Sequence, residues 1–296
     1  MIINKGRRPF YWSLGTWIIL ALYAYSPAKP SQKSPYQQIR IPLGMQSGVP
    51  FDKDHEGNYS VEGFEIDSSG NLYFLAGNKE TLACFTRDRK SVFRKMYSHL
   101  VGGEMIIVGG SLFTFEMGNE SLYTIVELNK ADGSVIKEYP NVKKVLASRG
   151  CLQIDSYIFT DSMLKIRYID SEGIEKTKFA CFDLHGRLLP DCKAPGSAAI
   201  AKEEYFEHLG KIGDNYVLGK FIEEGKKFLI SLRDPSDKIL SEASIETKYL
   251  ADPLCGTQGC MPPDHRKVRN NKFYWLNRDQ NMAAITVIDL ATFFRK

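Results

Sequence analysis

The stretch that decides the fold is "EIDSSGNLYFL", at residues 65–75. An apolar strand start is followed by the polar turn Asp-Ser-Ser-Gly-Asn and then by an aromatic strand. Such a turn is favoured because short polar side chains bond to nearby backbone amides and Gly70 accepts a positive φ. With the residues that follow, the period-two pattern predicts four short antiparallel strands, "GFEID", "NLYFLAG", "TLACFT" and "SVFRKMY".

This meander recurs along the chain. Its second half returns as "YTIVELNKADGSVIKEY", "KFACFDLHGRLLPDC" and "FLISLRDPSDKILSEA", and "AAITVIDLATFF" gives one more strand before the chain ends. Its first half returns less regularly, as "GEMIIVGGSLFTFEM", "GCLQIDSYIFTDS", "GKIGDNYVLGKF" and "VRNNKFYWLN". A four-stranded unit that returns every ~40–55 residues is typical of a β-propeller blade.

The sequence therefore predicts an all-β protein, a β-propeller of five or six four-stranded blades. A blade that is apolar on both faces can bury them only against neighbouring blades. The last unit lacks a fourth strand, whereas "QQIRIPLG" near the N-terminus is a strand with no partner nearby in sequence. We expect this strand to complete the last blade and close the propeller. Five units can be counted, the interval 141–180 is long enough to hide a sixth, and a β-sandwich is the alternative fold.

The N-terminal segment has a different character. Lys5, Arg7 and Arg8 form a positive start, and residues 9–28 carry no charge. This pattern predicts a signal peptide or, if it is not cleaved, a membrane anchor over residues 1–28. Residues 29–38 read as a linker and 39–296 as the propeller domain. The propeller would then be exported, as a periplasmic or secreted protein or tethered by residues 9–28 to the outer face of the cytoplasmic membrane.

The charge balance argues against a nucleic-acid partner. The formal net charge is +4, and residues 1–28 hold three of the basic side chains and no acid, which leaves +1 on the remainder. A nearly neutral domain has no electrostatic reason to bind nucleic acid.

Six cysteines suit an oxidising compartment. Cys181 and Cys192 stand on the two arms of an expected hairpin, and Cys255 and Cys260 flank two glycines. Both pairs are disulfide candidates, with buried free thiols as the alternative. Neither spacing suits a zinc site, because histidines are sparse around these cysteines.

The segment "VEGFEIDSSGNLYFL" at residues 61–75 resembles blades of the NHL and gluconolactonase-like propeller superfamily. In the gluconolactonase-like branch, the resemblance implies a calcium-dependent lactone hydrolase with an acidic residue of a "Glu-Gly-Pro" start among the metal ligands. Glu62-Gly63 matches that start, although Phe64 replaces the proline. The resemblance thus implies Glu62 as a calcium ligand, with Asp155, Asp214 and Asn215 as later-blade residues of the right type.

Two functions remain open from the sequence. No serine nucleophile elbow or phosphate-binding glycine loop is present. This absence favours a non-catalytic binding or scaffold propeller without a cofactor, with an unknown protein or small-molecule partner on its loop faces. The alternative is a calcium-dependent, lactonase-like hydrolase whose metal ion, in the central tunnel, would polarise a carbonyl oxygen.

Overall fold

The computed structural model describes most of the chain after residue 35. The described ranges are 36–44, 46–53, 59–61, 63–76, 81–98, 104–116, 123–160, 163–172, 178–190, 207–249, 265–279 and 281–295. They fall within the compact unit Ser34–Lys296. No helix among the described residues is long and apolar enough to cross a membrane. The apolar segment 9–28 lies outside these ranges.

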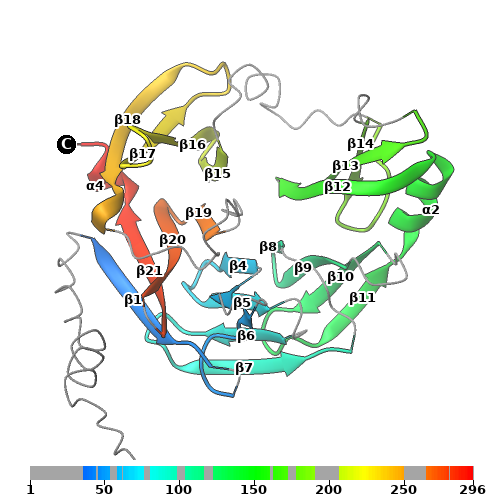
Figure 1. Cartoon of the computed structure of the whole chain (residues 1–296), viewed down its shortest axis with the longest axis horizontal. Helices are drawn as coiled ribbons and strands as arrows, with labels where there is room; N and C mark the ends of the chain where they lie inside the picture. The colour runs from blue at the N-terminus through cyan, green and yellow to red at the C-terminus, as the bar shows by residue number, and fades with distance from the viewer. Residues whose placement is uncertain are drawn as a thin grey trace, which may run out of the picture. The chain divides into compact units, whose positions relative to one another are not determined.

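Five antiparallel sheets form the blades, labelled by strand in Figure 1. Blade 1 contains β4 (Gly63–Ile66), β5 (Leu72–Ala76), β6 (Thr81–Phe85) and β7 (Ser91–Met96). Blade 2 contains β8 (Met105–Val108), β9 (Ser111–Glu116), β10 (Thr124–Asn129) and β11 (Val135–Tyr139). Blade 3 contains β12 (Cys151–Thr160), β13 (Met163–Asp170) and β14 (Lys178–Asp183). Blade 4 contains β15 (Glu207–Ile212), β16 (Asn215–Ile222), β17 (Lys227–Arg233) and β18 (Ile239–Glu246). Blade 5 contains β19 (Arg266–Arg269), β20 (Lys272–Asp279), β21 (Met282–Asp289) and β1 (Gln37–Pro42).

Short elements connect or flank the blades. They are the pair β2 (Asp52–Lys53) and β3 (Tyr59–Ser60), the helices α2 (Asn141–Ser148) and α4 (Leu290–Phe293), and the 3-10 turn η1 (Thr247–Tyr249).

The predicted propeller and its closure are confirmed. The N-terminal strand β1 pairs with β21 in antiparallel register, from Gln37 opposite Val287 to Pro42 opposite Met282. It supplies the fourth strand that the last repeat lacks. The third strands of all five blades, β6, β10, β14, β17 and β21, carry the recurring sequence unit.

The first three strands of blade 1 are buried on both faces, as a propeller requires. Along β5, Leu72 and Phe74 join a cluster that includes side chains of blade 5, whereas Tyr73 and Leu75 join one that includes blade 2. All four side chains are buried. Because successive strand residues point to opposite faces, one fully apolar strand can serve two interfaces. Two further clusters join blade 2 to blade 3 and blade 4 to blade 5.

The interval 141–180 differs from the sequence expectation. It holds no sixth blade among the described residues, but helix α2 followed by the long strands β12 and β13. No turn interrupts the strand at the place expected inside "GCLQIDSYIFTDS", because β12 runs through Asp155 and Ser156, with register shifts between Cys151 and Gln153 and between Ile154 and Ser156. Blade 3 has three described strands, and an isolated antiparallel bridge joins Phe182 to Leu188.

Candidate binding site

A buried ionic cluster joins the first strands of three blades. The Glu65 carboxylate, on β4, has no exposed surface and accepts hydrogen bonds from the Arg269 guanidinium at 2.9 and 2.8 Å. The Lys267 ammonium lies 3.3 Å from the same carboxylate and donates to the Met105 carbonyl of β8 at 3.1 Å. Burial alone would raise the pKa of Glu65, but Lys267 and Arg269 outweigh it, and the pKa is lowered.

A second ion pair links blade 4 to blade 5. The Arg266 guanidinium, almost wholly buried, donates two hydrogen bonds of 2.7 Å to Glu207. It also lies 5.2–5.4 Å from the ring centres of Phe221, Phe228 and Trp275. Burial raises the pKa of Glu207, against the opposing effect of Arg266. The carboxylates on β4 and β15 thus have cationic partners on β19.

The structure describes three of the four residues proposed as calcium ligands, and Asp155 lies on a different blade from Asp214 and Asn215. Glu62 lies outside the described residues. Asp155, on β12, forms an ion pair with Arg167 of β13, whereas Asp214 is exposed in the turn before β16 and Asn215 begins that strand. Within the described ranges, no three His, Cys, Asp or Glu side chains are placed to share a metal ion.

One of the predicted disulfide cysteines is oxidised. Cys181, buried on β14, is disulfide-bonded, whereas Cys84 and Cys151 are free thiols. Its three remaining candidate partners, Cys192, Cys255 and Cys260, lie outside the described residues. The pairing of Cys255 with Cys260 therefore stays a prediction.

We expect Cys181 to be bonded to Cys192. The amide of Leu189 donates to the Cys181 carbonyl at 2.8 Å, so Cys192 follows only three residues later, a span of at most ~10 Å. Trypsin should cut after Arg187, so a non-reducing digest analysed by mass spectrometry should contain the peptides 179–187 and 188–193 joined together. A cross-link from Cys181 to the 255–260 segment would contradict this pairing.

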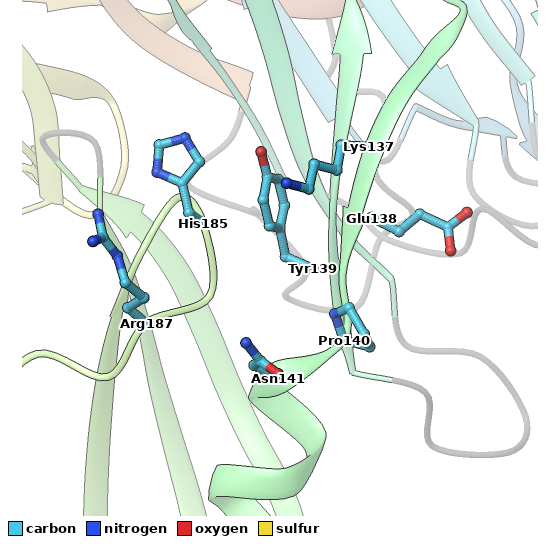
Figure 2. Close-up of a pocket in the computed structure, with 7 residues that line it drawn as sticks. All are labelled: Lys137, Glu138, Tyr139, Pro140, Asn141, His185 and Arg187. Carbon is cyan, nitrogen blue, oxygen red and sulfur yellow. The ribbon is translucent and has the colours of Figure 1, made fainter.

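A pocket of about 570 Å³ lies where blade 2 meets blade 3 (Figure 2), within the roughly 300–1,000 Å³ of small-molecule sites. One wall is the end of β11 and the start of α2, and the other is the turn after β14. The lining residues are Lys137, Glu138, Tyr139, Pro140, Asn141, His185 and Arg187.

Tyr139 is the centre of this junction. The His185 ring meets the Tyr139 ring edge-on at 5.3 Å, and the Lys137 ammonium lies 5.2 Å from the centre of the Tyr139 ring. Gly186, with φ of +73°, lies so close that a Cβ there would be 3.3 Å from Tyr139. In Figure 2 the carboxylate of Glu138 points away from the space between Tyr139 and His185.

The two carboxylates beside the pocket are already hydrogen-bonded. Glu127 accepts from Ser111 at 2.6 Å and from the Tyr139 hydroxyl at 2.7 Å. The Ser111 hydrogen bond is the main reason that the pKa of Glu127 is lowered. Burial and the Glu127 hydrogen bond raise the pKa of Tyr139 to about 12.

Asp183 holds the turn that carries the other wall. It accepts from the backbone amides of His185 and Arg187, both at 2.9 Å, and from the Arg187 side chain at 2.7 Å. Burial opposes the charged form, but these hydrogen bonds outweigh it and lower the pKa of Asp183. The turn therefore presents His185 and Arg187 from a fixed base.

The comparisons with known proteins add little beyond this geometry. No family model and no curated protein matches the chain. Among solved structures, BamB from Moraxella catarrhalis is similar at 12% identity and a TM-score of 0.33, over 84% of this chain and 95% of that one. A luciferin-regenerating enzyme is similar at 11% identity and a TM-score of 0.39, over 86% of this chain and 96% of that one. A structural genomics protein of unknown function from Bacteroides thetaiotaomicron is similar at 11% identity and a TM-score of 0.41, over 86% of this chain and 77% of that one. Likenesses at this level carry no argument about activity or partner.

Sequence reasoning did not single out the pocket residues. His185 lies within the hairpin expected between Cys181 and Cys192, and it occupies the turn after β14. A comparison between repeats could have found them, because Lys137 and Tyr139 stand at the end of the fourth strand of blade 2 as Lys95 and Tyr97 stand at or just after the end of that of blade 1.

Proposed function

We propose that this chain is an exported β-propeller that binds a partner and catalyses no reaction of its own. The observation that carries the proposal is the ion pairing of the Glu65 carboxylate. Glu65 is bonded to Arg269 and Lys267, and it thereby links blade 1 to blade 5. A calcium-dependent hydrolase needs oxygen ligands that are available to the ion. Calcium could use this carboxylate only by displacing the Lys267 ammonium and the Arg269 guanidinium, which are partly buried.

The pocket between blades 2 and 3 is the candidate contact site for that partner. It has the volume of a small-molecule site, and its walls come from two blades that share a packed apolar cluster, which includes Tyr139. The ionic cluster of Glu65, Lys267 and Arg269, in contrast, is occupied by its own ion pairs. A small molecule, or a side chain of a protein partner, is therefore the occupant that the pocket suits.

Two observations support export. The disulfide at Cys181 suits an oxidising compartment, where such bonds persist. The positive start and the uncharged residues 9–28 have the order of a secretion signal or anchor. We propose a periplasmic or secreted propeller, or one tethered to the outer face of the cytoplasmic membrane.

Calcium and chelator separate the two functional hypotheses. For the full chain in nonionic detergent, we expect the same melting temperature with added calcium and with EDTA, and no bound metal after purification. A ligand that binds only the folded state must raise its apparent stability, so a calcium enzyme should respond to both additions. A melting temperature that EDTA lowers and calcium restores would contradict the proposal. Glu62 would then be the first residue to replace, with lactone hydrolysis as the assay.

A further inference from the structure

We propose that the pocket between blades 2 and 3 binds a small ligand through an oxyanion, a carboxylate or a phosphate. This inference rests on the proposed function, because it names the ligand chemistry of the candidate contact site. Its basis is the difference between this junction and its equivalent one blade earlier.

The junction between blades 1 and 2 is closed. The Tyr97 hydroxyl donates to the Gly133 carbonyl at 2.6 Å, and a Cβ on Gly133 would lie 2.7 Å from Phe93. Asp132, just before that glycine, accepts hydrogen bonds from the backbone amide and the hydroxyl of Ser134, which are the main cause of its lowered pKa. The charge of Lys95 lowers the pKa of Asp132 further. Here the strand-end lysine faces an acidic side chain.

The junction between blades 2 and 3 reverses that charge. Tyr139 takes the place of Tyr97, but its hydroxyl donates to Glu127 and not to the facing turn. His185 precedes the turn glycine where blade 2 has an aspartate, and Arg187 follows it. Lys137, His185 and Arg187 therefore line the same pocket, and in Figure 2 the rings of Tyr139 and His185 stand between Lys137 and Arg187.

The donors at this pocket have unused capacity. Arg187 uses its Nε for Asp183, and within the described part of the chain its terminal nitrogens have no protein acceptor. The same holds for the ammonium of Lys137, the ring nitrogens of His185 and the amide of Asn141. Arginine and lysine side chains that line one pocket offer charged donors to the oxygens of a carboxylate or a phosphate.

The nearby acids do not cancel this arrangement. Glu127 is bonded to Ser111 and Tyr139, and Asp183 is bonded to its own turn. Their charges still reduce the local field, and Lys137 and Arg187 are exposed to solvent. We therefore expect modest affinity, with a Kd on the order of 1 mM for inorganic phosphate at low salt.

The histidine ring signals of the full chain in nonionic detergent give a local readout. The chain has five histidines, and a His185→Gln variant identifies the signal of interest. Sodium phosphate and sodium succinate are titrated separately at fixed pH, with sodium chloride of equal ionic strength as the reference. We expect a saturable shift of the His185 signal with at least one of the two anions and none with chloride. Tighter binding of phosphate would indicate a phosphorylated ligand, and tighter binding of succinate a carboxylate.

Matched variants test the site itself. Lys137→Gln and Arg187→Gln should each raise the Kd by about fivefold to tenfold, because each removes one charge-assisted contact. Lys95→Gln, at the equivalent place in the closed junction, should leave the Kd unchanged. The absence of a saturable shift, or equal effects of Lys137→Gln and Lys95→Gln, would overturn the proposal. Neither result depends on calcium, so it would leave the metal test of the proposed function intact.

Discussion

Replacement of Glu65 by alanine is expected to lower the free energy of unfolding by about 3–5 kcal/mol, as is typical when one partner of a buried ion pair is removed. The carboxylate is fully buried and has two cationic partners on β19. Its removal leaves Lys267 and Arg269 without their counter-charge between blades 1 and 5. The measurement is the urea unfolding of the wild-type and variant chains, followed by circular dichroism.

An exposed acid on another blade provides the control. Glu246 pairs with Lys248 at the surface, and Glu246→Ala should change the free energy of unfolding by less than about 1 kcal/mol.

The stabilisation by Glu65 should depend on pH, because the pKa of Glu65 is lowered in the folded state. Its contribution is present above the pKa of an unfolded glutamate, about 4.3, and is lost as the pH falls through the folded-state pKa. The difference in the free energy of unfolding between wild type and Glu65→Ala should therefore become smaller as the pH is lowered. Equal effects of the two alanine variants would contradict the role given to Glu65.

Replacement of Ile41 by alanine is expected to lower the free energy of unfolding by about 2–5 kcal/mol, the usual range when a buried isoleucine is truncated to alanine. Ile41 lies on the closing strand β1 and is only 1% exposed, in the cluster shared by blades 5 and 1. The substitution removes apolar contacts at the place where the two ends of the chain meet. The same urea unfolding measures it.

Val92→Ala is the matched control for the closing strand. Val92 lies on the outermost strand of blade 1, as Ile41 does in blade 5, but it is 47% exposed. Its replacement should change the free energy of unfolding by about 0.5 kcal/mol or less. If Ile41→Ala were no more harmful than Val92→Ala, β1 would not be the strand that holds the propeller closed.

The strands and tight turns were the predictable part of the fold. Alternating apolar residues and turn chemistry act over a few positions, so one sequence displays them. The pair Asn270 and Asn271 is an example, because both adopt positive φ, of 51° and 59°, in the turn between β19 and β20. The missing fourth strand of the last repeat likewise predicted the pairing of β1 with β21.

Helix α2 was not predicted, although a signal was present. It buries Val142 and Leu146, four positions apart, and so shows one apolar face to blades 2 and 3. Eight residues give only two turns of that period, too short a run to stand out beside strand-like neighbours. The unbroken strand β12 was missed for a related reason, because Asp155 and Ser156 have the composition of a turn.

The ionic cluster and the pocket depend on contacts between distant residues. Glu65 and Arg269 stand 204 positions apart, and nothing in a single sequence pairs them. The pocket was within reach of repeat comparison, because Asp132 and His185 occupy matching places before a turn glycine. The metal ligands proposed from the family resemblance stay a prediction, since Glu62 lies outside the described residues.

A double-mutant cycle between Glu65 and Arg269, run with and without calcium, shows whether the Glu65 carboxylate holds blades 1 and 5 together or is available to a metal ion. We expect a coupling energy of about 2 kcal/mol or more, within the range for contacting charged residues, and the same value at either calcium level. A coupling below about 0.5 kcal/mol, or one that calcium abolishes, would contradict this expectation.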